Sequence, residues 1–242
     1  MIYIPVEAQL LTIAVLFYVH DACLMLFVNE GIITRRGKKW AATLDKNGLL
    51  LRGKRLFIPN LLLLHAPVYR LAWHPEKIEQ TQAWDWAADT VSYGWFAFCA
   101  YGMAIALFLV TPVVYFAYRS DIMLLWCLAL IYYFSIAAGV GIYRDRAQFG
   151  LTGKKALTIF LECLLCPPLV LNVVRKLSLA RAIRANLVAS AFQVLEAGQW
   201  LALRGELVAD IDAEIADTDA ADRIAGLNQS REILTGMNRA CP

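Results

Sequence analysis

Residues 94–143 read GWFAFCAYGMAIALFLVTPVVYFAYRSDIMLLWCLALIYYFSIAAGVGIY, and the chain is organised around them. Its two apolar runs, 94–118 and 122–143, carry no charge and are separated only by the tripeptide RSD at 119–121. About 20 apolar residues at 1.5 Å per residue cross the hydrocarbon layer of a bilayer, so each run predicts a transmembrane helix. Because the turn is too short to hold a domain, the two helices form a hairpin that leaves from and returns to one side of the membrane.

The composition supports the same class. The 242 residues are 60% hydrophobic and only 18% charged, with a mean hydropathy of +0.53, whereas a soluble domain carries roughly a quarter charged residues. The length accommodates a membrane domain plus one small soluble module. The six cysteines are scattered, mostly in apolar segments, which argues against a disulfide framework. We therefore expect a predominantly α, polytopic helical membrane protein.

Residues 1–28 predict the first transmembrane helix, with the span placed at 8–28. No Lys or Arg precedes the apolar run and no small-residue cleavage site follows it, which favours a retained span over a signal peptide. The ionisable pair His20 and Asp21 falls near the middle of this span, where each charge costs at least ~2.5 kcal/mol. Two interpretations stay open: a buried polar contact with other helices, or a shallower span with the pair at the interface.

Residues 29–93 form a basic loop that holds ten of the 23 Lys and Arg residues. Turn signals at 46–48 (KNG) and 52–54 (RGK) supply glycines for the positive φ of tight turns. Short apolar runs at 40–44, 49–51 and 56–58 flank these turns and predict the strands of a small antiparallel β-meander. Further along, loosely spaced apolar positions between 74 and 89 predict an interfacial helix that leads into the helical hairpin at 94–143.

Residues 144–174 contain a fourth apolar segment, ALTIFLECLLCPPLVLNVV at 156–174. Glu162 interrupts it, and the pair Pro167–Pro168 breaks a helix. Basic residues lie on both sides of the segment, so a single crossing would place one basic cluster on the wrong side of the membrane. A re-entrant or in-plane segment is therefore favoured over a full fourth span, which remains the alternative.

Residues 175–242 predict a cytosolic, amphipathic helical tail. Apolar residues from Leu177 to Leu195 fall on one stripe at three- and four-residue steps, behind a basic first turn. The second half is acidic but keeps an apolar face at Leu207 and Ile211. Anionic headgroups would repel this half, so it is expected to meet a protein partner or the basic first loop.

The positive-inside rule orients the chain. For a bacterial inner (plasma) membrane, the location that the composition favours, the rule places the N-terminus outside and the basic loop and the C-terminus in the cytoplasm. Basic residues beside the spans are expected to bind anionic lipid phosphate rather than nucleic acid. These lipid-phosphate candidates are Arg35, Arg36, Lys38, Lys39, Arg52, Lys54, Arg55, Arg175 and Lys176.

Residues able to carry chemistry are few. The intramembrane polar candidates are His20, Asp21 and Glu162, of which Glu162 either pairs with a nearby lysine such as Lys154 or Lys155 or serves in a proton or ion relay. Cys163 and Cys166, three apart on one helical face, are weak redox or metal candidates. No phosphate-binding loop, nucleotide fingerprint, nucleophile elbow or zinc motif is present in the sequence, so no cofactor and no metal are expected.

Three functional classes follow. The first is a non-catalytic subunit or scaffold of a membrane complex, working through the cytosolic loop and tail. The second is a small transporter or proton-coupled or ion-coupled protein that uses His20, Asp21 and Glu162 as a homo-oligomer, since three or four spans are few for a transport path. The third is a membrane enzyme for lipid-linked substrates, whose available catalytic groups are Asp45, His65, His74, Glu76 and Asp85.

Overall fold

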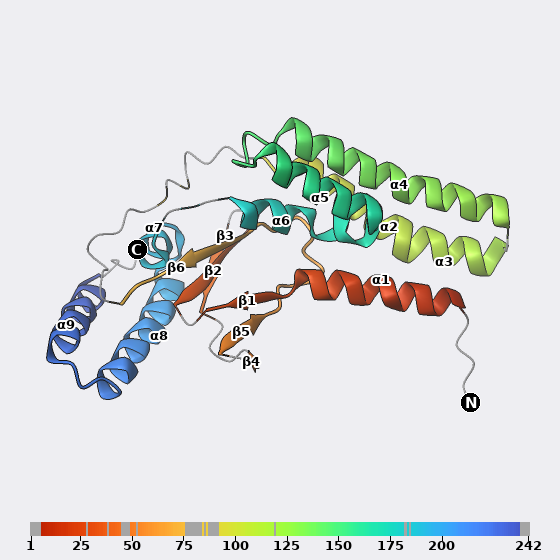
Figure 1. Cartoon of the computed structure of the whole chain (residues 1–242). Coiled ribbons are helices and arrows are strands. Elements are labelled where there is room, and N and C mark those ends of the chain that lie inside the picture. Colours follow the sequence, from red (N-terminus) through yellow and green to blue (C-terminus); the bar gives the residue numbers. More distant parts are fainter. Residues whose placement is uncertain are drawn as a thin grey trace, which may run out of the picture. The chain divides into compact units, whose positions relative to one another are not determined.

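The computed structural model describes residues 6–27, 29–37, 39–44, 49–51, 53–75, 84, 86, 92–118, 120–181, 183 and 185–237, without the side chains of 6–8, 10 and 36. This part of the chain is mostly helical and contains two small sheets (Figure 1). The chain divides into two compact units. The helical unit comprises Met1–Leu24, Ile58–Pro67 and Val91–Ala182, and the sheet unit comprises Met25–Phe57, Val68–Thr90 and Ile183–Pro242.

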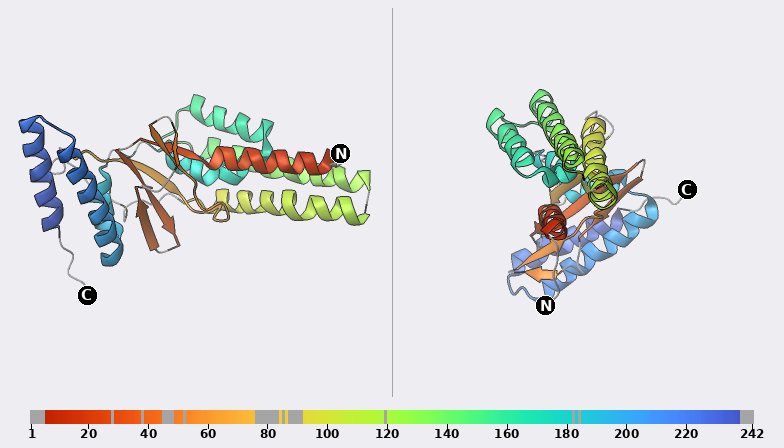
Figure 2. Two further views of the ribbon diagram at one scale, coloured as in Figure 1. Left: turned by 90° about the horizontal axis from the view of Figure 1, so that it is seen from below. Right: turned by 90° about the vertical axis from the view of Figure 1, so that its right-hand side faces the viewer.

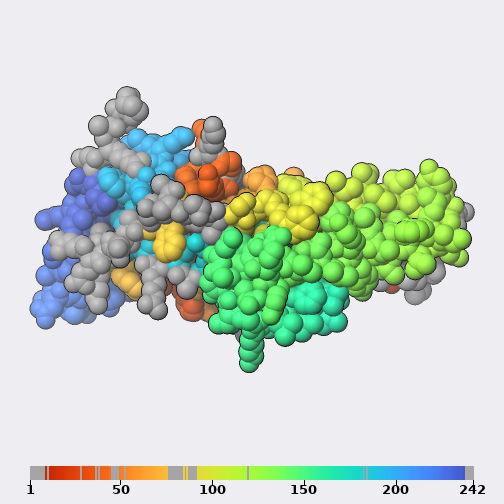
Figure 3. All heavy atoms as spheres, turned by 90° about the horizontal axis from the view of Figure 1, so that it is seen from above, coloured from red at the N-terminus to blue at the C-terminus, as the bar shows by residue number. Residues whose placement is uncertain are grey.

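Two helices of the helical unit are long and apolar enough to cross a bilayer, as the sequence predicts. They cover Gly94–Tyr118 and Asp121–Arg144, with 25 and 24 residues, and only 28% and 33% of their most apolar windows are buried. Figure 3 shows the two segments, coloured yellow to green, side by side, and Figure 2 (right) views them nearly end-on. Most of their apolar side chains therefore face outward, whereas a core helix of a soluble protein is mostly buried.

Pro112 changes the geometry of the first of these helices. It lacks a backbone N–H and cannot continue the regular ladder, and π-helical turns, Ala106–Val110 and Val114–Tyr118, lie on either side of α3 (Thr111–Val113). The Thr111 hydroxyl donates a hydrogen bond to the Ala106 carbonyl at 2.8 Å. The segment is thus α2 (Gly94–Ile105) followed by a locally widened helix, which is one of the known responses to an internal proline.

The predicted first span at 8–28 is not confirmed. The helix α1 runs over Val6–Ala22 and is followed by the strand β1, Leu24–Leu26. Asp21 lies in the last turn of α1 and bonds to other parts of the helical unit, so the helix ends where its ionisable residues find partners. At 17 residues, α1 has the shortest length that crosses a bilayer.

The apolar segment 156–174 is not one continuous helix. The helix α5 (Gly153–Leu165) begins at Thr152, whose hydroxyl accepts a hydrogen bond from the Lys155 backbone N–H, and it stops before the two prolines. A 3-10 turn over Pro167–Asn172 then leads into the short helix α6 (Val173–Ala180). Because the prolines interrupt the helix, neither piece alone is long enough to span the hydrocarbon layer.

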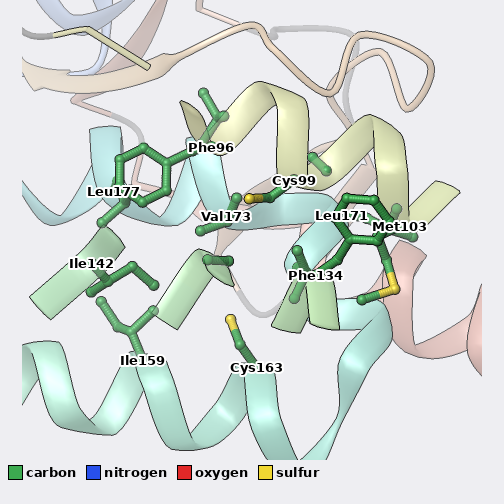
Figure 4. Close-up of a cluster of buried hydrophobic side chains, with 14 of the residues drawn as sticks. Phe96, Cys99, Met103, Phe134, Ile142, Ile159, Cys163, Leu171, Val173 and Leu177 are labelled. Atoms are coloured by element: carbon green, nitrogen blue, oxygen red, sulfur yellow. The ribbon is translucent and has the colours of Figure 1, made fainter. Parts of the chain in front are cut away.

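Two glycines let the helices of this unit approach closely. A Cβ atom built on Gly139 of α4 (Asp121–Arg144) would overlap the ring of Phe160 on α5, and one built on Gly102 would overlap the ring of Phe134. Both rings thus pack directly against glycine backbone. Apolar side chains from α2, α4, α5 and α6 fill the interior of the unit, as Figure 4 shows for Phe96, Phe134 and Leu177.

Replacing Gly139 with Ala is expected to destabilise the protein by about 1–3 kcal/mol, because overfilling a packed contact forces side chains and backbone to shift. The matched control is Gly205→Ala, since a Cβ at Gly205 meets no atom within 4 Å. Alanine there is expected to be neutral or to stabilise the helix by up to about 1 kcal/mol. Denaturant unfolding in detergent, followed by circular dichroism, measures both, and equal effects of the two changes would contradict the close contact.

The sheet unit contains the β-structure. One antiparallel sheet has the order β3-β2-β6, formed by β2 (Glu30–Arg36), β3 (Lys39–Thr43) and β6 (Val68–Ala72), and the other has the order β1-β5-β4, with β4 (Leu49–Leu51) and β5 (Lys54–Phe57). The expected hairpin around Gly53 is present, with φ +75° at Gly53 and Leu51 opposite Lys54. The expected turn at 46–48 and nearly all of the expected helix between 74 and 89 lie outside the described residues.

The strand pairing differs from the predicted single meander. Strand β3 pairs with β2 through a turn at Gly37, which has φ +63°, rather than with the strand that follows it. The charged strand β2 escaped the prediction because its apolar positions are confined to Ile32 and Ile33, both fully buried. The intrinsic β-propensity of its residues is a weak guide for a central strand such as β2, because pairing with the strands on either side stabilises it.

The apolar stripe that the sequence places on one helix, from Leu177 to Leu195, is divided between two helices of different units. Leu177 of α6 packs in the core of the helical unit, whereas Leu187 begins α7 (Leu187–Val194) in the sheet unit. The Asn186 side chain accepts a hydrogen bond from the Val188 N–H at 2.7 Å and caps α7. The apolar residues expected on one helix therefore pack in two different hydrophobic cores, one in each unit.

The acidic half of the tail forms an antiparallel helix pair, α8 (Ala197–Ala216) and α9 (Ala221–Gly236). Leu207 and Ile211 are fully buried in the core of the sheet unit. Helix α8 contacts both α9 and β3, so the chain's own first loop contributes to the cover of this apolar face. The protein partner stays a prediction. Ion pairs join the pair of helices, between Glu214 and Arg223 and, at 3.1 Å, between Asp212 and Arg231.

Candidate functional site

A cluster of charged side chains lies where α1, α5 and α6 meet in the helical unit. The Lys176 ammonium contacts a carboxylate oxygen of Asp21 at 2.9 Å and one of Glu162 at 2.8 Å. The Lys176 and Asp21 side chains are 17% and 19% exposed, whereas Glu162 is 44% exposed. Two sequence candidates far apart along the chain are thus brought to one lysine.

The helix break at the two prolines creates this meeting. Glu162 lies in the last turn of α5, and the 3-10 turn after Pro167 redirects the chain so that Lys176, in the first turn of α6, returns to the glutamate. Asp21 reaches the same lysine from the end of α1. The features that made this segment ambiguous in the sequence therefore build the cluster.

Asn172 and Arg175 extend the cluster on the buried side. The Asn172 amide donates to the Tyr18 carbonyl at 2.9 Å and to a carboxylate oxygen of Asp21 at 3.1 Å, and its own oxygen accepts from Arg175. We refer to Asp21, Glu162, Asn172, Arg175 and Lys176 as the charge cluster.

Arg175 is the most deeply buried charge of the cluster, with 3% of its surface exposed. Its guanidinium donates to the carbonyls of Asn60 at 2.7 Å and Leu63 at 3.3 Å, and to the Tyr18 hydroxyl at 3.4 Å. The Tyr18 hydroxyl donates in turn to the Leu61 carbonyl. Arg175 therefore fastens the segment Ile58–Pro67 to α1 and α6 through carbonyl oxygens, the kind of partner that a buried cation requires.

The charge cluster is close to neutral because it holds two carboxylates, both paired with Lys176, and two cations. Burial alone would lower the pKa of Lys176, but its hydrogen bond to Glu162 and the charge of Asp21 outweigh burial and raise that pKa above the ordinary 10.5. Lys176 is therefore a protonated, doubly paired cation at neutral pH. This arrangement orders three helices, and it also places a proton donor between two carboxylates.

The other intramembrane candidate is not part of this cluster. His20 precedes Asp21 but is exposed on α1. The expected partners of Glu162, Lys154 and Lys155, are not its partners, because Lys176 takes that place and the Lys155 ammonium donates to the Ala180 carbonyl. Tyr18 and Asn172 were not predicted as site residues, because the hydrogen bond that joins them links residues 154 positions apart.

The cysteines of CLLC lie beside the cluster. Cys163 is fully buried and points from α5 into the apolar interior (Figure 4), whereas Cys166 is half-buried, and both are free thiols. Burial raises the pKa of the Cys163 thiol to about 12 and also raises that of Cys166. Within the described residues, no group of three or more His, Cys, Asp or Glu side chains is arranged to hold a metal ion.

Cys163 is expected to react with iodoacetamide at pH 8 far more slowly than an exposed cysteine, since the thiolate is the nucleophile and burial both raises the pKa of this thiol and blocks access to it. Mass spectrometry of peptides taken at successive times measures the alkylation rate. The denatured protein is the control, in which Cys163 and Cys166 both react readily. Rapid alkylation of Cys163 in the folded protein would favour a redox role over a packing role.

The residues proposed as catalytic groups of a membrane enzyme do not form a cluster within the part of the chain that the structure describes. The His65 Nδ1 atom and the Tyr101 hydroxyl are hydrogen-bonded at 2.7 Å, and His74 is exposed. Asp45, Glu76 and Asp85 lie outside the described residues.

The lipid-phosphate candidates fall into two groups. Arg175 and Lys176 are occupied inside the charge cluster. Lys39 pairs with Glu196 at 3.3 Å, Lys54 lies 4.4 Å from the centre of the Phe27 ring, and the Arg55 guanidinium donates to the Leu44 carbonyl. Arg35 is exposed and lies over the Trp40 ring. Lys38 and Arg52, and the side chain of Arg36, lie outside the described residues.

Comparisons with protein-family models, with curated proteins and with solved structures give no match to this chain. Its function is therefore inferred from its own residues and their geometry.

Proposed function

We propose that this chain is an integral membrane protein of a bacterial inner membrane and serves as a non-catalytic subunit or scaffold. One observation carries the proposal: the two long helices keep about 70% of their most apolar windows unburied. Such large apolar surfaces on water-soluble monomers are rare, and lipid is the simplest cover for helices of this length.

In the proposed topology, α1 is a third span at the short end of the usual range, and 156–174 is a re-entrant or in-plane segment. The N-terminus lies outside, and the basic residues of the sheet unit lie on the cytoplasmic side, next to anionic headgroups. The charge cluster supports a structural role, because Lys176 pairs with both carboxylates and the cluster ties α1 to α6.

Thiol accessibility in intact cells and in opened membranes tests this topology, using Ser120→Cys and Asp219→Cys. Reaction of position 120 from outside, and of position 219 only after opening, is expected. Reaction of position 219 from outside would overturn the three-span arrangement and place the sheet unit on the other side. Release of the protein by alkaline carbonate would overturn the membrane proposal itself.

For the scaffold role, we propose that the turn between α8 and α9 contacts a basic surface of a partner protein. Asp217, Asp219 and Asp222 are exposed there, and charge complementarity steers association. Reversing all three to Lys is expected to remove a partner that co-purifies with the full chain, whereas Glu232→Lys, an exposed change elsewhere on α9, leaves it bound. Equal sets of bound proteins in all three samples would contradict the scaffold role.

The second candidate is a proton-coupled or ion-coupled protein acting as a homo-oligomer. It is favoured by the position of Lys176 between Asp21 and Glu162, beside a broken helix, as in many transporters. In proteoliposomes, Asp21→Asn and Glu162→Gln would each abolish pH-gradient-dependent ion flux under this hypothesis. Absence of such flux in the unaltered protein leaves the scaffold role.

A further inference from the structure

The exposed apolar residues of the sheet unit gather in one place. Among the described residues of this unit, nearly all exposed large apolar side chains belong to the sheet β1-β5-β4 or directly adjoin it. Strand β4 is an edge strand, and Figure 1 shows it beside β5. These exposed apolar residues are Met25 in β1, Phe27 directly after it, and Leu49, Leu50 and Leu51 in β4.

The three leucines are exposed on both faces of the strand. Leu49, Leu50 and Leu51 are 73%, 67% and 49% exposed, and successive side chains of a strand point to opposite faces. A protein partner that docks on one face of a hairpin would leave the other face in water. A hairpin that dips into a lipid interface has both faces covered at once.

Each face also carries a cation. Leu51 is opposite Lys54 and Leu50 is opposite Arg55, and side chains opposite each other in an antiparallel pair lie on the same face. The Lys54 ammonium lies over the exposed Phe27 ring. Leucine, an aromatic ring and basic groups in close proximity are the composition of segments that sit at a membrane surface.

We propose that the β4–β5 hairpin, residues 49–57, inserts its leucines into the headgroup region of an anionic bilayer. The proposal rests on the membrane assignment made above and adds a second, separate contact with the lipid. The hairpin stays in the headgroup region because β4 is an edge strand, and unpaired backbone groups are not tolerated in the hydrocarbon core. The same contact covers an edge that would otherwise be open to pairing with other chains.

The test uses the full chain in vesicles of zwitterionic lipid, with or without about 30% anionic phosphatidylglycerol. A nitrobenzoxadiazole label is attached at Leu50→Cys, in a background where Cys23, Cys166 and Cys241 are Ser and the buried cysteines are kept. Labels at Leu125→Cys, on the exposed face of α4, and at Ala209→Cys, on the exposed face of α8, are the lipid and water references. Quenching by spin-labelled lipid and by aqueous iodide is compared at the three positions.

The label at position 50 is expected to be quenched by headgroup-region spin labels and protected from iodide relative to position 209, more strongly with the anionic lipid. Lys54→Gln is expected to lower the ratio of inserted to free hairpin about fivefold, because each cation near an anionic surface contributes roughly that factor. Arg231→Gln, which removes one exposed positive charge on α9, outside the hairpin and outside the lipid-phosphate candidates, leaves the ratio unchanged.

Three outcomes would overturn the proposal. Iodide quenching at position 50 equal to that at 209, in both lipids, means that the hairpin is in water. Protection from both quenchers that grows with protein density means that a second copy covers the strand. Absence of lipid quenching at position 125 removes the membrane assignment, and with it this inference, whereas quenching at 125 without quenching at 50 removes only this inference.

Discussion

Replacing Lys176 with Met is expected to lower the free energy of unfolding by about 2–4 kcal/mol. Removing one partner of a buried ion pair leaves an uncompensated charge, which typically costs 3–5 kcal/mol. Asp21 is the carboxylate left in this state, since it is only 19% exposed. The loss of the Lys176–Glu162 pair contributes little to this cost, because Glu162 is more exposed and water screens its charge. Denaturant unfolding in detergent, followed by circular dichroism, measures this decrease in the free energy of unfolding.

The controls separate charge from shape. Lys154→Met, on the exposed surface of α5, is expected to change stability by less than about 0.5 kcal/mol. Adding Asp21→Asn to Lys176→Met is expected to recover at least about 1 kcal/mol, because groups in one ion-pair network are not independent. A double variant as unstable as the sum of the single ones would contradict a direct interaction between the two residues.

The pH dependence follows from the raised pKa of Lys176. A lysine with a higher pKa in the folded state binds its proton more tightly there, so its contribution is complete below the unfolded value near 10.5. That contribution is lost as the pH rises through the higher folded value. Between neutral pH and about 10, Lys176→Met is therefore expected to remove stability to the same extent, and the difference from the unaltered protein should shrink in stronger alkali.

The sequence predicted the elements whose signal is local. The two long apolar helices need only length and composition, and the hairpin at Gly53 needs only a turn glycine between short apolar runs. In the same way, Pro167 and Pro168 predicted the break after α5. Each of these features depends on residues close together in the chain, where propensity and periodicity carry the information.

The site was predicted only in part. Asp21 and Glu162 were singled out because charged residues in apolar segments are unusual, but nothing in the sequence paired them with Lys176, which looked like a lipid ligand. Asn172 gave no signal, since an asparagine becomes important only through the contacts that the fold supplies. The α6–α7 break also escaped, because one apolar stripe continued across it while its two halves entered different cores.

Replacing Arg175 with Met is expected to cost about 3 kcal/mol or more and to loosen the segment Ile58–Pro67. The carbonyls of Asn60 and Leu63 would each lose a hydrogen bond from a charged donor, and such a bond contributes about 1.5–3 kcal/mol. Arg175→Lys is expected to recover only a minor part, because a single ammonium cannot reproduce the planar fork that reaches several acceptors.

Hydrogen exchange gives this prediction a local readout that general destabilisation does not supply. In Arg175→Met, the amides of Ile58–Pro67 are expected to exchange faster than those of α4 at a denaturant concentration where both proteins stay folded. Arg146→Met is the matched control, since that arginine lies near the surface, donates to the Tyr143 carbonyl at 3.0 Å and stacks over its ring. If exchange in Ile58–Pro67 were the same in both variants, Arg175 would fill space without fastening the segment, and the charge cluster would tie only α1, α5 and α6.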